Sequence, residues 1–159
     1  MIKIGIDPDC DKSGFALIYQ NQTQLTTLTF FELFERFGQL INTYGKDNIK
    51  VYVECGFLNK SNWHRKVQGS SAINAKIGER TGANFETAKK ICEMCEYYDL
   101  KYIQVKPTRK KLNATEFKAI TRIEKRTNQE MRDAFMLFFG CENQDKIYST
   151  REEIRKAIK

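Results

Sequence analysis

The first residues of the chain alternate between apolar side chains and polar or small ones, in the two-residue period of a β-strand. Isoleucines take every second position from Ile2 to Ile6, and the pattern runs directly into Asp7. Pro8 lacks the N–H that a sheet ladder needs, so the strand is predicted to stop there. The polar turn that follows, and then the apolar run at residues 15–19, predict the second strand of a β-hairpin.

The rest of the chain alternates between strand and helix patterns. Three more strands are predicted at residues 24–30, 49–54 and 101–105. Apolar stripes at helical spacing predict helices at residues 31–44, from about 72 to 98 with interruptions at Gly78 and Gly82, at 115–125, at 127–139 and, as a short basic C-terminal helix, at about 149–158.

This order of elements predicts an α/β fold with a five-stranded mixed sheet flanked by helices. The first three strands are joined by short turns and should be antiparallel. The fourth and fifth should each arrive through a helical crossover and run parallel to the first. The 159 residues contain no repeat, low-complexity tract or linker, so we expect a single domain over residues 1–159.

The charge of the chain favours a polyanionic partner, because 27 Lys and Arg against 20 Asp and Glu leave a net charge of +7. No apolar run approaches the ~20 residues of a transmembrane helix. The N-terminus has the pattern of a strand rather than of a signal peptide. We therefore expect no membrane partner and a cytoplasmic location, in a bacterial cell or, if the chain is viral, in an infected cell.

The five cysteines are odd in number and irregular in spacing, which fits reduced thiols. Cys92 and Cys95 form a C-x-x-C pair, but no second such pair is present to complete a zinc site. Both fall on the apolar stripe of a predicted helix. Core packing is therefore favoured over metal or redox chemistry for this pair.

Two of the predicted strands end in a carboxylate. Asp7 and Glu54 close the first and fourth strands, which should be parallel neighbours, so both side chains fall at one edge of the sheet. A carboxylate beside an apolar run is costly to bury unpaired, so Asp7 needs a metal, a cation or hydrogen-bond donors. The alternative is a turn aspartate that caps its own loop.

The last long helix supplies two more carboxylates. Glu130 and Asp133 are three residues apart and share a helix face. Four converging carboxylates would repel one another unless divalent cations lay between them, and oxygen ligands suit Mg²⁺ or Mn²⁺. The alternative for Glu130 is a capping box with Thr127, whereas Asp133 lies past the first turn.

Four segments carry motifs in a fixed order: Ile4-Gly-Ile-Asp-Pro with Gly14-Phe-Ala-Leu-Ile, Glu54-Cys-Gly-Phe57, Ile77-Gly-Glu-Arg-Thr-Gly82 and Glu130-Met-Arg-Asp-Ala134. In this order they resemble segments of RuvC-type Holliday junction resolvases, within the RNase H-like superfamily: the first hairpin, the fourth-strand glutamate with its aromatic, the Gly-x-x-Arg-Gly helix segment and the closing Asp-x-x-Asp-Ala. The resemblance covers about residues 2–139. The departures are one residue inserted before Gly82, Asp9 in place of a small residue, Glu130 in place of Asp, and the extra C-terminal helix.

The resemblance implies a structure-selective endonuclease that resolves four-way DNA junctions. Asp7, Glu54, Glu130 and Asp133 would be both the catalytic residues and the ligands of two Mg²⁺ ions, with Mn²⁺ as a possible substitute. The resemblance also implies a homodimer. It points to the segment at about residues 72–85 as the interface, where apolar residues lie beside small ones that allow close helix approach.

Basic and aromatic side chains near these motifs are candidate DNA contacts. Lys106 and Lys118 fall where the resembled family places basic residues near its site. Three basic side chains would share one stripe of a predicted helix and suit phosphates, with an ordinary solvated face as the alternative: Lys118, Arg122 and Lys125. Phe57 and Trp63 could stack on unpaired bases, with core packing as the alternative.

Two other functions stay open at this level. One is a related nuclease of broader specificity, which would act on flaps, forks or RNA in hybrids and share the fold and the metal site. The other is a non-catalytic nucleic-acid-binding scaffold. The presence of all four carboxylates favours an enzyme over the scaffold.

Overall fold

In the computed structural model, which describes residues 1–59, 70–107 and 111–139, five strands form one mixed sheet in the order β3-β2-β1-β4-β5. β1 (Ile2–Asp7) pairs antiparallel with β2 (Ser13–Tyr19), and β2 pairs antiparallel with β3 (Gln22–Leu28). β4 (Ile49–Glu54) runs parallel to β1, and β5 (Lys101–Val105) runs parallel to β4. The predicted mixed sheet is confirmed, including the direction of each strand.

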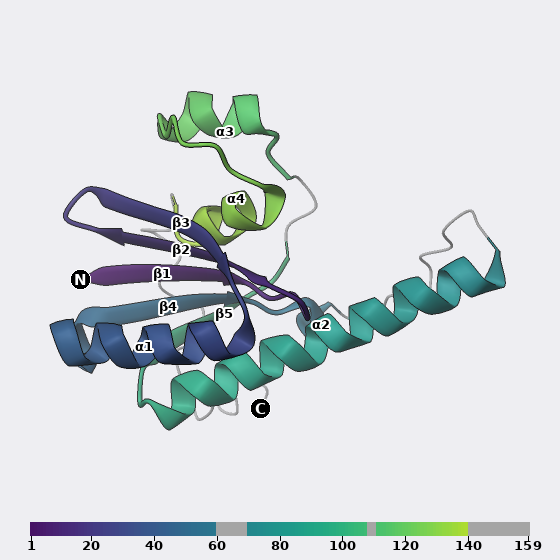
Figure 1. Ribbon diagram of the computed structural model, residues 1–159, viewed down its shortest axis with the longest axis horizontal. Helices are drawn as coiled ribbons and strands as arrows, with labels where there is room; N and C mark the ends of the chain where they lie inside the picture. The colour runs from purple at the N-terminus through teal and green to yellow at the C-terminus, as the bar shows by residue number, and fades with distance from the viewer. Residues whose placement is uncertain (60–69, 108–110, 140–159) are drawn as a thin grey trace, which may run out of the picture.

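Helices cover both faces of this sheet (Figure 1). α1 (Phe30–Tyr44) and α2 (Ser71–Tyr97) pack on one face and contribute to the first core cluster. α3 (Ala114–Thr121) and α4 (Gln129–Met136) contribute to a second cluster on the other face. This arrangement is the RNase H-like fold that the sequence predicts.

The central strands are apolar because both of their faces are covered. In β4, Val51 and Val53 join the cluster under α1 and α2, while Tyr52 between them joins the cluster under α3 and α4. In β1, the isoleucines at 2, 4 and 6 all belong to the first cluster and are fully buried. The second face of β1 carries Gly5, so it leaves space for a close neighbour.

α1 begins one residue earlier than predicted because Thr29 caps it. The Thr29 hydroxyl accepts a hydrogen bond from the Glu32 backbone N–H at 3.3 Å, and the Glu32 carboxylate accepts one from the Thr29 N–H at 2.7 Å. This capping box satisfies two N–H groups at the helix start. It also ends β3 at Leu28, two residues before the predicted end. A short 3-10 helix, η1 (Lys46–Asn48), then leads into β4.

α2 is one continuous helix, so the prediction that Gly78 and Gly82 interrupt it is wrong. Glycine weakens a helix by about 1 kcal/mol relative to alanine but does not break it. Only the C-terminal half of α2 packs on the sheet, and Figure 1 shows the N-terminal half extending beyond it. Cys92 and Cys95 lie in the packed half and are buried in the core, as predicted.

Two glycines form a seat for α4 on the sheet. A Cβ atom at Gly5 would lie 1.9 Å from the Ala134 carbonyl oxygen, and one at Gly14 would lie 2.1 Å from the Glu130 carbonyl oxygen. No side chain fits at either position, so the backbone of α4 rests directly on β1 and β2. This close approach fixes the distance between the end of β1 and the two α4 residues Glu130 and Asp133.

Gly5→Ala is expected to lower the free energy of unfolding by roughly 3 kcal/mol, because the added methyl collides with the α4 backbone rather than with a flexible side chain. Gly38→Ala is the matched control. Among the described residues, a Cβ there meets the Tyr98 hydroxyl at 3.5 Å, an ordinary van der Waals contact, so this change in α1 should stabilise the protein by about 0.5–1 kcal/mol. Urea unfolding of both variants measures the contrast, and equal effects would contradict the proposed seat.

Some predicted features fall outside the described residues. These are Trp63 and the C-terminal helix at about 149–158. Within the described segments, none of the helices combines the length and apolar character needed to cross a bilayer.

Candidate metal centre

Asp7 and Glu54 end adjacent parallel strands. The register pairs Ile6 with Val53, and each carboxylate residue comes next along its strand. Both side chains are half-buried. Residues at the carboxyl ends of neighbouring parallel strands meet at one edge of a sheet, which is where such folds place their sites.

α4 brings Glu130 and Asp133 to the same edge. The helix begins at Gln129, and its cap is Asn128, whose side chain accepts a hydrogen bond from the Met131 N–H at 2.9 Å. The alternative of a capping box between Thr127 and Glu130 is therefore excluded. Glu130 sits at the second helical position, whereas a capping box uses the third. Capping of α4 therefore does not use the Glu130 carboxylate.

The four carboxylates act on one another electrostatically. Burial, as the largest cause, and the negative charges of Glu54, Asp133 and Glu130 together raise the pKa of Asp7 to about 8, against the opposing charge of Lys111. Burial likewise raises the pKa of Glu54, with Lys111 opposing and Asp133 adding to the shift. Carboxylates from three separate elements thus act on one partly desolvated region.

The oxygens of the four carboxylates lie in one region but are not close enough for any three of them to share a metal ion as they stand. Among the described residues, no three of the four carboxylates have oxygens that all lie within 4.8 Å of one another. Asp133 is held from two sides instead. The Lys111 ammonium donates to Asp133 Oδ2 at 2.6 Å, and Gln129 Nε2 donates to Asp133 Oδ1 at 2.7 Å.

Lys111 and Gln129 are site residues that the sequence analysis did not assign. Gln129 precedes Asp133 by one helical turn, so its position follows once the start of α4 is known. Lys111 belongs to a basic run after β5, and only the tertiary structure shows that its ammonium reaches the carboxylates. Helical spacing was a usable signal for Gln129, whereas the sequence held none for Lys111.

The donor set fits a hard divalent cation. All four candidate ligands are carboxylates, they are partly withdrawn from water, and their mutual repulsion raises the pKa of Asp7. Hard oxygen donors of this kind suit Mg²⁺ or Mn²⁺ rather than zinc or copper. Among the described residues, Lys111 is the basic side chain that opposes the raised pKa values of Asp7 and Glu54, so this part of the site can accept more cationic charge.

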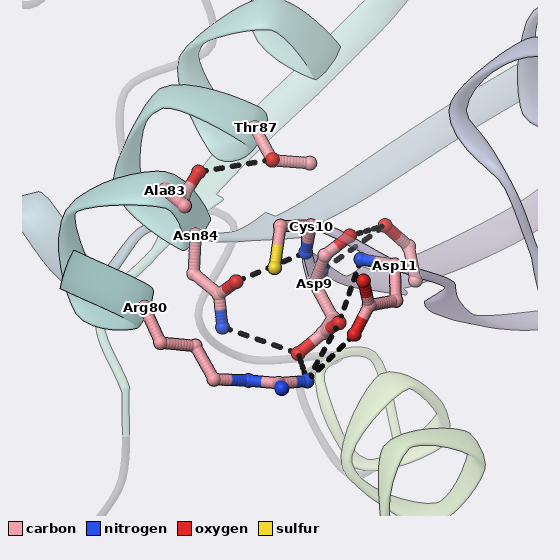
Figure 2. A network of polar contacts seen from close by, with 8 residues as sticks. Asp9, Cys10, Asp11, Arg80, Ala83, Asn84 and Thr87 are labelled. Carbon is pink, nitrogen blue, oxygen red and sulfur yellow. Dashed lines mark hydrogen bonds and ion pairs between the residues drawn. The ribbon is translucent and has the colours of Figure 1, made fainter. Parts of the chain in front are cut away.

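The loop after Asp7 carries a separate acidic group with its own counter-charge (Figure 2). The ligand atoms of Asp9, Cys10 and Asp11 do lie within 4.8 Å of one another. However, one guanidinium nitrogen of Arg80 lies 3.2 Å from Asp9 Oδ2 and 3.1 Å from Asp11 Oδ2. Asn84 adds a hydrogen bond to Asp9 and accepts one from the Cys10 N–H. This network ties the loop behind Asp7 to α2.

The candidate DNA contacts are spread more widely than predicted. Lys106 is exposed just after β5, and Lys118 is exposed on α3, where it pairs with Glu124. The predicted helical stripe through Lys125 is wrong, because α3 ends at Thr121 and Arg122 takes a left-handed conformation with φ 60°. The N–H of Arg122 closes the helix on the Lys118 carbonyl at 2.9 Å.

Two of the remaining candidates make contacts within the protein. Lys125 lies in the loop after α3, where its ammonium donates to the Leu25 carbonyl at 3.3 Å. Phe57 lies in the 3-10 helix η2 (Gly56–Leu58), half-buried against the first core cluster. Its assignment as a base-stacking residue stays a prediction, with packing already accounting for part of the ring.

No protein-family model and no curated protein sequence matches the chain. Among solved structures, Thermus thermophilus RuvC in complex with a Holliday junction substrate is 12% identical, with a TM-score of 0.47, and the match covers 86% of this chain and 89% of that one. A second Thermus thermophilus RuvC structure is 13% identical, with a TM-score of 0.42, and the match covers 86% and 90%. Both are structures of RuvC, the family that the sequence motifs resemble. The fold assignment itself stands on the strand order and helix placement of this chain.

Proposed function

We propose that this protein is a divalent-metal-dependent endodeoxyribonuclease that cuts branched DNA, with the four-way junction as its substrate. The observation that carries this proposal is the convergence of four carboxylates from β1, β4 and α4 on one edge of the sheet. The acidic group would be costly to keep without bound cations. The motif resemblance to RuvC-type resolvases indicates the branched substrate.

Each candidate site residue has a role under this proposal. Asp7, Glu54, Glu130 and Asp133 would hold two Mg²⁺ ions, or Mn²⁺ in their place. Ions held there would supply the charge that activates a water molecule and stabilises the leaving 3′ oxygen. Gln129 fixes the Asp133 carboxylate through its hydrogen bond of 2.7 Å, and the seat of α4 on β1 and β2 sets its height.

The basic surface would hold the DNA backbone. Lys106, Lys118 and Arg122 are exposed, and the chain carries a net charge of +7. Contacts of this kind release counterions from DNA, so they position the substrate without reading its sequence. Phe57 would then stack the exposed edge of its ring on unpaired bases at an opened junction.

A cleavage assay on a synthetic four-way junction tests the proposal. The junction is labelled in turn on each strand and incubated with Mg²⁺, with EDTA and with a linear duplex of the same sequence as controls. Paired nicks at symmetric positions, dependent on Mg²⁺ and absent from the duplex, are the expected result. Equal cutting of flaps and forks would instead favour the broader nuclease, and binding without cutting would favour the scaffold.

Symmetric cutting requires two sites related by a two-fold axis, so the proposal includes a homodimer. The projecting half of α2 offers a suitable surface. Ile73 and Ile77 lie one helical turn apart and are 53% and 40% exposed. Gly78 and Gly82 follow them, and no atom of the described residues lies within 4 Å of a Cβ placed at either glycine, which permits a second helix to approach closely.

The double change Ile73→Glu and Ile77→Glu is expected to convert the dimer to a monomer, because it places charges on the apolar face that would be buried. Sedimentation velocity at micromolar concentration measures the change. Phe31→Glu is the matched control, since Phe31 is a 78% exposed apolar residue on α1, away from this face. A wild-type protein that stays monomeric both alone and with junction DNA would contradict the dimer.

A further inference from the structure

The Lys111 side chain forms an ion pair with a carboxylate of the candidate site that has little access to water. Its ammonium contacts Asp133 Oδ2 at 2.6 Å, and the Asp133 side chain is only 9% exposed. Lys90 and Glu93 form a pair of similar length, 2.7 Å, in which both side chains are more than half exposed. The Lys111 pair therefore differs in having a carboxylate with little access to water.

The backbone next to Lys111 is held by two side chains of α4. The Leu112 carbonyl accepts hydrogen bonds from Arg132 Nε at 3.0 Å and from Gln129 Nε2 at 3.4 Å. The Arg132 side chain is buried and also donates to the Thr127 carbonyl at 2.9 Å. These contacts fix the point from which the Lys111 side chain reaches Asp133.

The position of the ammonium conflicts with metal binding at the same carboxylate. A Mg²⁺ ion bound by a carboxylate lies about 2.0–2.1 Å from the ligand oxygen. Lys111 already lies 2.6 Å from Asp133 Oδ2, so an ion on that oxygen would be close to a second positive charge. The lysine stem is flexible and the Lys111 side chain is 54% exposed, so the ammonium can move away.

We propose that Lys111 is a tethered counter-ion that competes with the divalent cation for Asp133, and that a DNA phosphate releases it. This inference rests on the proposed nuclease function and adds to it a coupling between substrate and metal. A phosphate near the site offers the ammonium another partner, so DNA and metal each favour binding of the other. The free protein would then bind metal weakly, and the metal site would fill when DNA is present.

Metal binding without DNA tests the competition directly. Lys111→Gln removes the charge but keeps a hydrogen-bond donor for Asp133, and we expect it to bind Mn²⁺ about tenfold tighter than the wild type. Lys111→Arg retains the charge and should bind Mn²⁺ like the wild type. Lys90→Gln is the matched control for loss of a lysine in an ion pair. Free Mn²⁺ is measured by electron paramagnetic resonance during titration at fixed pH and ionic strength.

A second measurement uses the unmodified chain and does not depend on how a variant folds. Mn²⁺ should increase the rate at which Lys111 is reductively methylated, measured by peptide mass spectrometry, while the rate at Lys90 stays constant. The proposal is overturned if Lys111→Gln binds Mn²⁺ no tighter than the wild type, or if Mn²⁺ leaves the methylation of Lys111 unchanged. Neither readout uses cleavage, so failure of the nuclease proposal would be seen separately in the junction assay.

Discussion

Asp7→Asn is expected to lower Mg²⁺-dependent cleavage of a four-way junction by about 10³-fold while leaving junction binding nearly unchanged. Asparagine has the same shape but lacks the negative charge that would hold the cation. Metal ions supply several kcal/mol of transition-state stabilisation, which corresponds to a rate factor of about this size. Binding should persist because it depends on the basic surface. Single-turnover cleavage and an equilibrium binding titration in EDTA measure the two effects.

Asp11→Asn is the matched control for this experiment. Asp11 is an exposed aspartate in the loop that follows Asp7, and it pairs with Arg80. It should retain most of the cleavage activity. Cleavage by Asp7→Asn at near the wild-type rate would show that the catalytic assignment is wrong. Glu130→Gln should also lower cleavage without unfolding the protein, since Asn128 rather than Glu130 caps α4.

The metal-free protein is expected to lose roughly 2–4 kcal/mol of stability between pH 5 and pH 8, or about 5–10 °C in Tm. Burial and the neighbouring carboxylates raise the pKa of Asp7 from 3.8 to about 8, so the folded state holds a proton that the unfolded state releases near pH 4. That contribution is complete below the unfolded pKa and is lost as the pH rises through the folded pKa. Thermal unfolding in EDTA across this pH range measures the loss.

Two comparisons isolate the Asp7 contribution. Asp7→Asn should flatten the pH dependence and be the more stable protein at pH 8 without metal. Mg²⁺ should restore stability to the wild type at pH 8 more than at pH 5, since only the ionised carboxylate binds it well. Hydrogen bonds and the Arg80 charge outweigh burial and lower the pKa of Asp9. Any change in stability caused by the titration of Asp9 therefore falls at more acidic pH than the change caused by Asp7. A wild-type Tm that rises from pH 5 to pH 8 in EDTA would contradict the assignment.

The strands and two of the carboxylates could be predicted because their signals are local. Alternation along β1 and β4 identifies the core face, and the parallel pairing of two such strands places Asp7 beside Glu54. The start of α4 was harder, because Thr127 and Asn128 are both good caps and differ by one position. That single-residue shift decides whether Glu130 caps the helix.

The remaining differences between the predicted and the observed structure come from tertiary contacts. α3 ends at Thr121 although its apolar and basic pattern continues, because Ile123 turns back to pack on the cluster that contains Phe117. Lys111 reaches Asp133 only because α4 anchors the Leu112 carbonyl. No periodicity in the sequence records either contact, so a helix end and a site residue were missed.

The glycine seat of α4 bears on how the protein is synthesised. β1 and β4 leave the ribosome well before α4, so Asp7 and Glu54 are present while Glu130 and Asp133 have yet to be made. The four carboxylates come together only when α4 docks on Gly5 and Gly14. A nascent chain, or one truncated before Gln129, therefore lacks half of the proposed ligands, and we expect it to be unable to cut DNA.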